Sequence, residues 1–417
     1  MIEWLSMTQP IGDLLASELR TINPNSSDYA PRAVDAVLAA AQAAGATDIH
    51  LQPNGAELEV KFRVDGVLLP VAAFPAAIAG NMVARLKVLS GLLTYHTDRP
   101  QEGRIRLPQD NVDMRVCTYP TLHGERAVVR LFGGAERYQH LDDLGLPIDV
   151  LPTLQGLVAQ TSGAILVSGP AGSGKTTTVY ACLREIARQQ GGERNLMSIE
   201  DPVEVSVDGV AQSQVHPTVG LDLAAGLRFL MRQDPEVIMV GEIRDRPTAE
   251  AALQASLTGH LLLSTFHAGS AAETVGRLLD MGIEPYVLRS GVLAILHQRL
   301  LRRLCACAEP SREPEAHLGL PVQRAMVPHG CPECGGTGYR GRFLLVEMLT
   351  LARTELGRAI LSRSDSATIE RLAVESGMVT RWQRACRAVE NGSTSPAEVR
   401  RVLGFSGNAS EQPPQAP

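Results

Sequence analysis

The feature that most constrains how this chain folds is a glycine-rich stretch that begins at Gly169. It fills every fixed position of the pattern G-x-x-x-x-G-K-[ST] with Gly169, Pro170, Ala171, Gly172, Ser173, Gly174, Lys175 and Thr176, and Thr177 follows. In such a loop, backbone N–H groups and the N-terminus of the next helix surround phosphate oxygens. Lys175 would add a mobile positive charge, and the Thr176 hydroxyl would ligate Mg²⁺. The stretch therefore predicts a nucleotide phosphate site, with a glycine-rich turn that binds nothing as the alternative.

The flanks of this loop agree with that prediction. An apolar strand is expected at 164–168 and a helix from about Thr176 to Gln189. Residues 237–240 form a second continuous apolar run, and such runs alternate with helical stretches. The alternation predicts an α/β fold over 150–300, with a mostly parallel sheet that is covered by helices on both faces.

Acidic side chains follow two of the expected strands, at the edge where open α/β sheets bind ligands. Glu242 follows the run at 237–240 and could hold the water shell of Mg²⁺, or it could be a solvated strand-end acid. A strand at 196–199 leads into Glu200-Asp201-Pro202-Val203-Glu204, whose carboxylates repel one another unless a cation or polarised water lies between them. A nucleotide hydrolase needs such a carboxylate to orient water, although an exposed acidic turn has the same composition.

Two histidines, His260 and His267, flank a further apolar strand within 258–268. A histidine at a sheet edge can sense the terminal phosphate of a nucleotide, and it can equally be structural. The sequence contains no Asn-Lys-x-Asp segment of the guanine-reading type, so ATP is expected rather than GTP.

The segment before the loop predicts a separate, small α+β domain. An Ala-rich helix is expected from about Ala33 to Ala44, and the alternating stretch at 57–64 ends in Asp65-Gly66, which is a hairpin signal. Similar alternation recurs at 104–107 and 112–116. The expected organisation is a lead at 1–30, this domain at 31–135, a linker at 136–149, the α/β core at 150–300, a cysteine-containing subdomain at 301–345, a helical part at 346–405 and a disordered tail at 406–417.

Four of the seven cysteines fall within 305–334, as C-x-C, 23 intervening residues and C-x-x-C. The N-terminus lacks the cationic and apolar pattern of an export signal, and no uncharged apolar run reaches about 18 residues. A reducing, cytoplasmic location is therefore expected, where clustered cysteines favour a structural zinc site over disulfides. The ligands would be Cys305, Cys307, Cys331 and Cys334, with free thiols as the alternative.

Composition separates the competing functions of a phosphate-loop protein. The formal net charge is −6 and aromatic residues make up 4%, whereas a nucleic-acid translocase is expected to carry basic stripes and aromatic stacking surfaces. A regulatory protein that binds nucleotide without hydrolysing it would not need the acids that follow the strands. The only lysines among the 39 basic residues are Lys61, Lys87 and Lys175, so each retained lysine is of interest.

Taken in order, these segments resemble the secretion ATPase family of type II secretion and type IV pilus assembly, the GspE/PulE/PilB group. The matching segments are its N2 motifs at 47–50, 63–66 and 100–104, its aspartate box at 200–204, its atypical Walker B motif at 232–245 and its histidine box at 258–267. The resemblance covers about residues 31–403, and the combination of motifs is highly specific.

The resemblance implies a RecA-like P-loop NTPase core that follows a PAS-like N2 domain, with a small zinc-binding subdomain and a C-terminal helical part. Within it, Glu204 would be the general base and Glu242 the acid near Mg²⁺. The residues that it places in catalysis are Glu204, Glu242, Lys175, Arg104, Arg115, Arg228, Arg232 and His267. The arginines would line the nucleotide site, where a guanidinium can stabilise charge that develops during phosphoryl transfer.

The function implied by the resemblance is an ATP-hydrolysing motor of a type II secretion system that drives pseudopilus assembly and protein export. Type IV pilus assembly is the alternative, and a nucleic-acid translocase on the same core is a remote one. The cofactors would be ATP, Mg²⁺ and Zn²⁺. The expected assembly is a homohexamer that stays cytoplasmic, works beside inner-membrane platform proteins and binds no nucleic acid directly.

Three features of the chain depart from the family's pattern. About 30 residues precede the N2 region, where larger members carry a docking domain. Glu102 stands where the family usually has Asp, and Cys305-Ala306-Cys307 is one residue shorter than the usual C-x-x-C. The short segment before N2 concerns how the chain docks, and the shortened cysteine pair concerns whether the zinc site forms.

Overall fold

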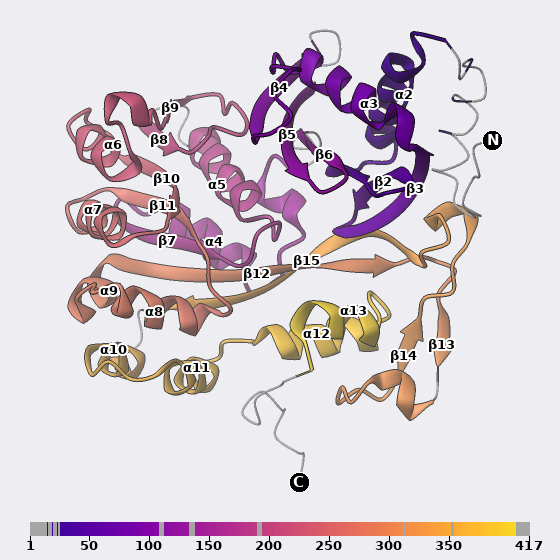
Figure 1. The fold of residues 1–417 in the computed structure, drawn as a ribbon. Helices are drawn as coiled ribbons and strands as arrows, with labels where there is room; N and C mark the ends of the chain where they lie inside the picture. The colour runs from indigo at the N-terminus through magenta and orange to yellow at the C-terminus, as the bar shows by residue number, and fades with distance from the viewer. Residues whose placement is uncertain are drawn as a thin grey trace. The chain divides into compact units, whose positions relative to one another are not determined.

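The computed structural model describes Leu15, Leu19, Asn23 and residues 26–107, 112–132, 138–189, 194–311, 313–351 and 354–405. The chain divides into two compact units, whose elements are labelled in Figure 1. Unit 1 contains residues 1–136, 304–309 and 328–341, and unit 2 contains residues 137–303, 310–327 and 342–417. None of the helices in these described ranges has both the length and the apolar character that a membrane crossing requires.

Unit 1 is built around a six-stranded antiparallel sheet in the order β3-β2-β1-β6-β5-β4. The strands are β1 (Asp48–Pro53), β2 (Glu57–Val64), β3 (Val67–Pro75), β4 (Gln101–Leu107), β5 (Val112–Thr121) and β6 (Gly124–Phe132). Helices α2 (Tyr29–Ala43) and α3 (Ala76–Leu89) pack against each other and share a core with alternate strand residues such as Leu58, Val60 and Phe62. The predicted alternation at 57–64 and the predicted hairpin at Asp65-Gly66, which joins β2 to β3, are both confirmed.

Unit 2 contains a seven-stranded sheet in the order β15-β12-β7-β11-β10-β8-β9. The strands are β7 (Gly163–Ser168), β8 (Leu196–Glu200), β9 (Val210–Gln214), β10 (Val237–Ile243), β11 (Leu261–Phe266), β12 (Val292–Leu304) and β15 (Tyr339–Thr350). Each neighbouring pair from β12 to β9 is parallel. The carboxyl ends of β7, β8, β10 and β11 therefore meet at one edge of the sheet.

Both faces of this sheet are covered by helices. Along β7, Ala164 and Leu166 join a core with α6 to α11, whereas Ile165 and Val167 join a second core with α4 and α5. The helices are α4 (Leu151–Val158), α5 (Lys175–Gln189), α6 (Leu223–Leu230), α7 (Arg246–Leu257), α8 (Ala271–Asp280), α9 (Pro285–Gly291), α10 (Thr354–Leu361) and α11 (Ser366–Glu375). Because the central strands β7, β10 and β11 are buried on both sides, they read as continuous apolar runs, and the predicted mostly parallel sheet with helices on both faces is confirmed.

The remaining helices of unit 2, α12 (Arg381–Glu390) and α13 (Pro396–Leu403), are attached through buried carboxylates. Glu347 on β15 is fully buried and accepts hydrogen bonds from the backbone N–H of Ala271 and from Arg381. Glu398 on α13 is also fully buried and accepts from Arg302 of β12. Strands β13 (Glu309–Ser311) and β14 (Ala325–Val327) form a separate two-stranded sheet.

Several expected segments fall outside the described residues. These are nearly all of the lead at 1–30, the start of the linker at 136–149 and the tail at 406–417. Within the rest of the linker range, the 3₁₀ turn η2 (Leu141–Leu144) places Leu141 in the core beside α5. The expected cysteine-containing range at 301–345 is divided, since 304–309 and 328–341 belong to unit 1.

Candidate functional site

The glycine-rich loop joins the end of β7 at Ser168 to the start of α5 at Lys175, as predicted. Gly169 has φ +147°, and a Cβ at this position would lie 2.5 Å from the backbone oxygen of Gln298. Gly172 and Gly174 have φ of +72° and +86°, a region that residues with a side chain disfavour. The glycines are therefore required for the turn, which delivers the loop to the N-terminus of α5, where the first N–H groups have no intrahelical partner.

Lys175 is drawn into the loop rather than extended into solvent. It is 9% exposed, and its Nζ donates hydrogen bonds to the backbone oxygens of Gly169 and Pro170, each at 3.0 Å. Burial lowers the pKa of Lys175, whereas the nearby carboxylates of Glu242 and Glu204 raise it. The ammonium is therefore close enough to both acids to feel their charge. It donates to two carbonyl oxygens of the loop, and an anion bound in the loop could take their place as acceptor.

Glu242 and His267 meet beside this lysine, although they come from different strands. The Glu242 carboxylate on β10 is 2.9 Å from Nε2 of His267, which directly follows β11, and it accepts a 2.6 Å hydrogen bond from Nε of Arg244. Burial lowers the pKa of His267, as does the charge of Lys175 to a lesser extent. The structure thus brings together Lys175, Glu242 and His267, which the sequence placed at one sheet edge.

The two glutamates of the acidic segment have different environments. Glu200, at the end of β8, is 2% exposed, and its carboxylate accepts hydrogen bonds from Tyr180, from Ser198 and from Gln212. Burial and the Glu200 carboxylate together raise the pKa of Tyr180 above its usual range. Glu204 is exposed and its charge raises the pKa of Lys175, so of these two glutamates it is the one with an accessible carboxylate.

The four arginines predicted for the nucleotide site are divided between the units: two are in unit 2 and two are in unit 1. Arg228 on α6 and Arg232 just after it are exposed, and among the described residues neither forms an ion pair with a carboxylate. Arg104 and Arg115 lie in unit 1, where they are directly paired across β4 and β5. Arg115 also forms an ion pair with Glu102. Two cations opposite each other in a sheet repel, so an anion bound beside Arg104 and Arg115 would reduce this repulsion.

Two residues of the loop's surroundings were not identified from the sequence. Tyr180 lies four residues after Thr176 on α5, donates to Glu200 and accepts a 3.3 Å hydrogen bond from the backbone N–H of Glu204. Its spacing from Thr176 could have indicated it, since residues four apart share a helix face. Gln298 on β12 is fully buried, but in the sequence it stands between His297 and Arg299, so no local pattern indicates its burial.

The four clustered cysteines come together in unit 1. One sulfur from each lies within 4.8 Å of the others, and the Sγ separations are 3.8 Å for Cys305–Cys331, 3.9 Å for Cys307–Cys334 and 3.8 Å for Cys331–Cys334. A tetrahedral site with Zn–S bonds of about 2.3 Å requires sulfurs about 3.8 Å apart. The donor set and its spacing therefore fit Zn²⁺, and the shortened C-x-C pair reaches the same geometry.

Backbone N–H groups donate hydrogen bonds to one of the four sulfurs, that of Cys334. The Cys334 Sγ accepts hydrogen bonds from the N–H groups of Cys331 at 3.1 Å and Gly338 at 3.2 Å. Burial opposes ionisation, but these hydrogen bonds hold the pKa of the Cys334 thiol at about 6, which favours the thiolate that a metal requires. The segment is also fastened to the rest of unit 1, because Gly341 N–H donates to Asp65 in the β2–β3 turn at 2.7 Å.

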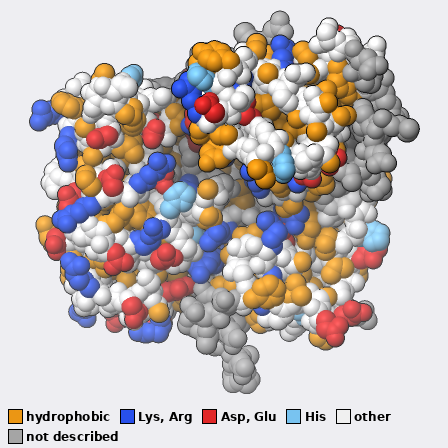
Figure 2. Space-filling view, viewed as in Figure 1, with side chains coloured by type: hydrophobic (Ala, Val, Ile, Leu, Met, Phe, Trp, Pro, Cys, Tyr) orange, Lys and Arg blue, Asp and Glu red, His pale blue; other side chains and the backbone are white. Residues whose placement is uncertain are grey.

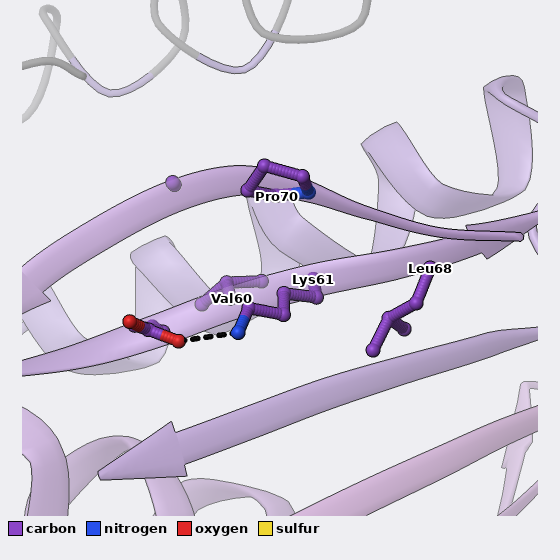
Figure 3. A pocket seen from close by; sticks show the side chains of 6 residues that line it. Val60, Lys61, Leu68 and Pro70 are labelled. Carbon is purple, nitrogen blue, oxygen red and sulfur yellow. Dashed lines mark ion pairs between the residues drawn. The ribbon is translucent and has the colours of Figure 1, made fainter. Parts of the chain in front are cut away.

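The other two lysines have separate roles from Lys175. Lys87 on α3 is fully buried and forms an ion pair with Glu125, and its Nζ also donates to the backbone oxygen of His96 at 2.7 Å. Lys61 forms an ion pair with Glu59 on β2, at the side of a pocket of about 390 Å³ (Figure 3). The pocket is lined by Glu59, Val60, Lys61, Leu68, Pro70 and Ala72. Its polar groups are already paired with each other, and none belongs to the phosphate loop.

The visible surface of unit 2 carries both signs of charge. Figure 2 shows basic and acidic side chains interspersed over its helices on the face in view. Unit 2 also contains exposed ion pairs, such as Arg246 with Glu250 at 2.6 Å and Arg371 with Glu375 at 2.6 Å. A face of this kind differs from the continuous basic stripe expected of a nucleic-acid translocase.

Comparison with known proteins gives consistent matches over most of the chain. The profile of the family described as Type II/IV secretion system protein matches residues 24–401. The Type II secretion system ATPase E of Vibrio cholerae is 40% identical over 395 residues, covering 90% of this chain and 76% of that protein. The Type IV pilus assembly ATPase PilB of Thermus thermophilus is 37% identical and covers 85% of this chain, which spans 41% of PilB.

Among solved structures, the ATPase DotB of Yersinia pseudotuberculosis has a similar fold. The two align with a TM-score of 0.69 and 22% sequence identity, covering 92% of this chain and 96% of DotB. At that identity, the likeness concerns the fold alone. The α/β architecture is therefore shared with a known ATPase.

Proposed function

Because the chain belongs to the Type II/IV secretion system protein family, we propose that it is the ATP-hydrolysing motor of a type II secretion system. It hydrolyses ATP to ADP and phosphate, and the hydrolysis drives pseudopilus assembly and protein export. The observation that supports this proposal most is the ion pair of Glu242 with His267 beside Lys175 of the glycine-rich loop, at the sheet edge where Glu204 follows β8. Phosphoryl transfer needs a phosphate cradle, a cation site and a water-orienting carboxylate, and these residues can supply all three.

Each residue has a role that follows from its position. The backbone N–H groups of Gly169 to Thr177 and the Lys175 ammonium bind the phosphates. The Thr176 hydroxyl and the Glu242 carboxylate would hold Mg²⁺, which would neutralise charge on the phosphates. Glu204 orients and deprotonates the attacking water, since it is exposed and within the field of Lys175. His267 holds the Glu242 carboxylate and senses the terminal phosphate.

The domain organisation is proposed to be that of a RecA-like core at 150–300 and a PAS-like N2 domain at 31–135. Arg104 and Arg115 face each other on β4 and β5 of N2, and their charges suit the terminal phosphate of a bound nucleotide. With Arg228 and Arg232 of the core, they stabilise charge that develops during transfer. A homohexamer would let arginines from one subunit reach the nucleotide of the next.

Zinc is proposed to be structural. Cys305, Cys307, Cys331 and Cys334 would hold it with four thiolates and no open position, as structural sites do. When bound, the ion supplies cohesion to a segment with few apolar residues. Of the expected range 301–345, we assign this role to 304–309 and 328–341, which belong to unit 1, and we propose that 346–405 is a C-terminal helical part.

The motor is proposed to act at the cytoplasmic side of the inner membrane, through platform proteins of the secretion machine rather than through lipid or nucleic acid. Type IV pilus assembly is the alternative. The coverage favours secretion, because the chain spans 76% of the secretion ATPase E of V. cholerae and 41% of PilB.

Two measurements test the proposal. Purified full chain with Mg²⁺ and ATP should release phosphate in steady state, and its rate should not rise when single- or double-stranded DNA is added. DNA-stimulated turnover would favour a translocase, and binding without turnover would favour a regulatory nucleotide binder. Deletion of the gene in its own bacterium should stop export of secreted enzymes while surface pili remain, and the reverse result would favour pilus assembly.

A further inference from the structure

We propose that Gln298 is a positioning residue that holds the phosphate loop in its binding shape from the neighbouring strand β12. The inference rests on the proposed ATPase function and adds a residue that lies about 120 positions beyond the loop. It starts from the fact that a phosphate loop has few side chains of its own to fix its conformation, since glycines dominate it.

The side chain of Gln298 connects the end of the phosphate loop, at Ser173, to the first turn of α5, at Thr178. Its Nε2 donates a 2.8 Å hydrogen bond to the backbone oxygen of Ser173, within the loop. Its Oε1 accepts a 3.0 Å hydrogen bond from the hydroxyl of Thr178, in the first turn of α5. One amide therefore fixes the loop backbone and the helix that the loop enters, and each half of the amide is used once.

The backbone of Gln298 lies close to the other end of the loop. A Cβ on Gly169 would lie 2.5 Å from the Gln298 backbone oxygen, and a Cβ on Gly174 would lie 3.3 Å from Nε2 of Gln298. Strand β12 is in parallel register with β7, where His297 is opposite Ser168, so the residue after His297 lies where the loop leaves β7. The first and last glycines of the motif thus approach one and the same residue.

Burial makes the arrangement costly to break. Gln298 is fully buried, as are its partner Thr178 and its neighbour His297. Replacing the amide by an apolar side chain would leave the Thr178 hydroxyl without its acceptor, a loss that low-dielectric surroundings make worse. Because the Ser173 peptide would then be released, the N–H groups on either side of it would no longer be preset toward phosphate.

The test uses the purified full chain, Mg²⁺ and a fluorescent non-hydrolysable ATP analogue. Gln298→Met keeps the volume of the side chain but removes both hydrogen bonds, and it should weaken binding by about tenfold or more, because losing buried hydrogen bonds that preset the loop makes the free energy of phosphate binding less favourable. Gln254→Met on the exposed side of α7 is the matched control and should bind within about twofold of the unmodified chain. ATP turnover of the unmodified chain is measured in the same experiment. Absence of turnover in that chain would contradict the ATPase proposal, independently of the result for Gln298→Met.

A second pair of variants tests the same clamp from the helix. Thr178→Val should weaken binding several-fold, whereas Thr178→Ser retains the hydroxyl and should restore it. In a chain that already carries Gln298→Met, Thr178→Val should weaken binding by less than it does alone. The reason is that both substitutions remove the same hydrogen bond, from the Thr178 hydroxyl to Gln298 Oε1. The inference is overturned if Gln298→Met or Thr178→Val lowers the melting temperature without changing nucleotide affinity, since Gln298 would then support the fold alone.

Discussion

The phosphate loop of unit 2 and the cysteine cluster of unit 1 are both tight, glycine-containing turns, but they are supported in different ways. Every hydrogen bond described for the four thiols runs between residues 305 and 338. The phosphate loop forms hydrogen bonds with distant strands: Gln298 of β12 donates to the backbone oxygen of Ser173, and the backbone oxygen of Phe266 on β11 accepts from Gly169 N–H at 3.2 Å.

This difference follows from where each segment obtains its stability. The cluster lies in a segment with little apolar core, so a metal can replace the burial that the segment lacks. The loop lies at the edge of a sheet that is buried on both faces, and it can remain glycine-rich because neighbouring strands fix its shape. Perturbing one region should therefore leave the other's ligand in place, and the variants below test this in order of their expected effect on ATP turnover.

Lys175→Ala should have the largest effect, lowering turnover by about 10³-fold or more because the mobile charge on the phosphates is lost. The zinc content and the melting temperature should change little. Lys61→Ala, which breaks only the surface pair with Glu59, is the matched control and should retain full turnover. Near-normal hydrolysis by Lys175→Ala would remove the basis for placing the nucleotide at this loop.

Glu204→Gln should slow hydrolysis by at least about 10²-fold while Mg²⁺–ATP still binds, as expected when a water-orienting base is lost. Glu200→Gln should instead destabilise the fold by about 1–3 kcal/mol, because Tyr180, Ser198 and Gln212 all donate to that carboxylate. Turnover and thermal unfolding of both variants separate the two roles. Normal turnover in Glu204→Gln together with a folded but inactive Glu200→Gln would exchange the assignments.

Arg104→Ala should lower turnover by about tenfold with little loss of nucleotide affinity, because its charge would act on the transition state rather than on bound ATP. The specific activity of the unmodified chain should rise steeply with protein concentration if neighbouring subunits complete the site. Arg32→Ala, an exposed arginine on α2 of the same unit, is the control. Concentration-independent activity from a species that sediments as a monomer would argue against arginines acting between subunits.

The double variant Cys331→Ser, Cys334→Ser should have the smallest effect on nucleotide affinity, less than about threefold, while losing about one zinc per chain. The melting temperature should fall, because the segment loses its cohesion. Cys117→Ser, outside the cluster, should keep its metal. Full zinc occupancy in the double variant would place the ligands elsewhere, and loss of ATP binding would show that the two regions are coupled.

Much of this protein could be predicted from short patterns in its sequence. The glycine-rich loop between β7 and α5, the apolar strands and the β2–β3 hairpin are local features, and each depends on residues that are close together in the sequence. The cysteine spacing predicted a cluster for the same reason, since the chain needs only to return once to bring the two pairs together.

Tertiary structure alone decided how the remaining side chains are used. Glu200 and Glu204 look alike in the sequence, but Tyr180 and Gln212 surround the first and leave the second exposed near Lys175. Gln298 carries no motif, and its role arises because β12 lies next to β7 in the sheet. Local patterns determine local backbone, whereas a carboxylate or amide takes its role from partners that packing brings from distant parts of the chain.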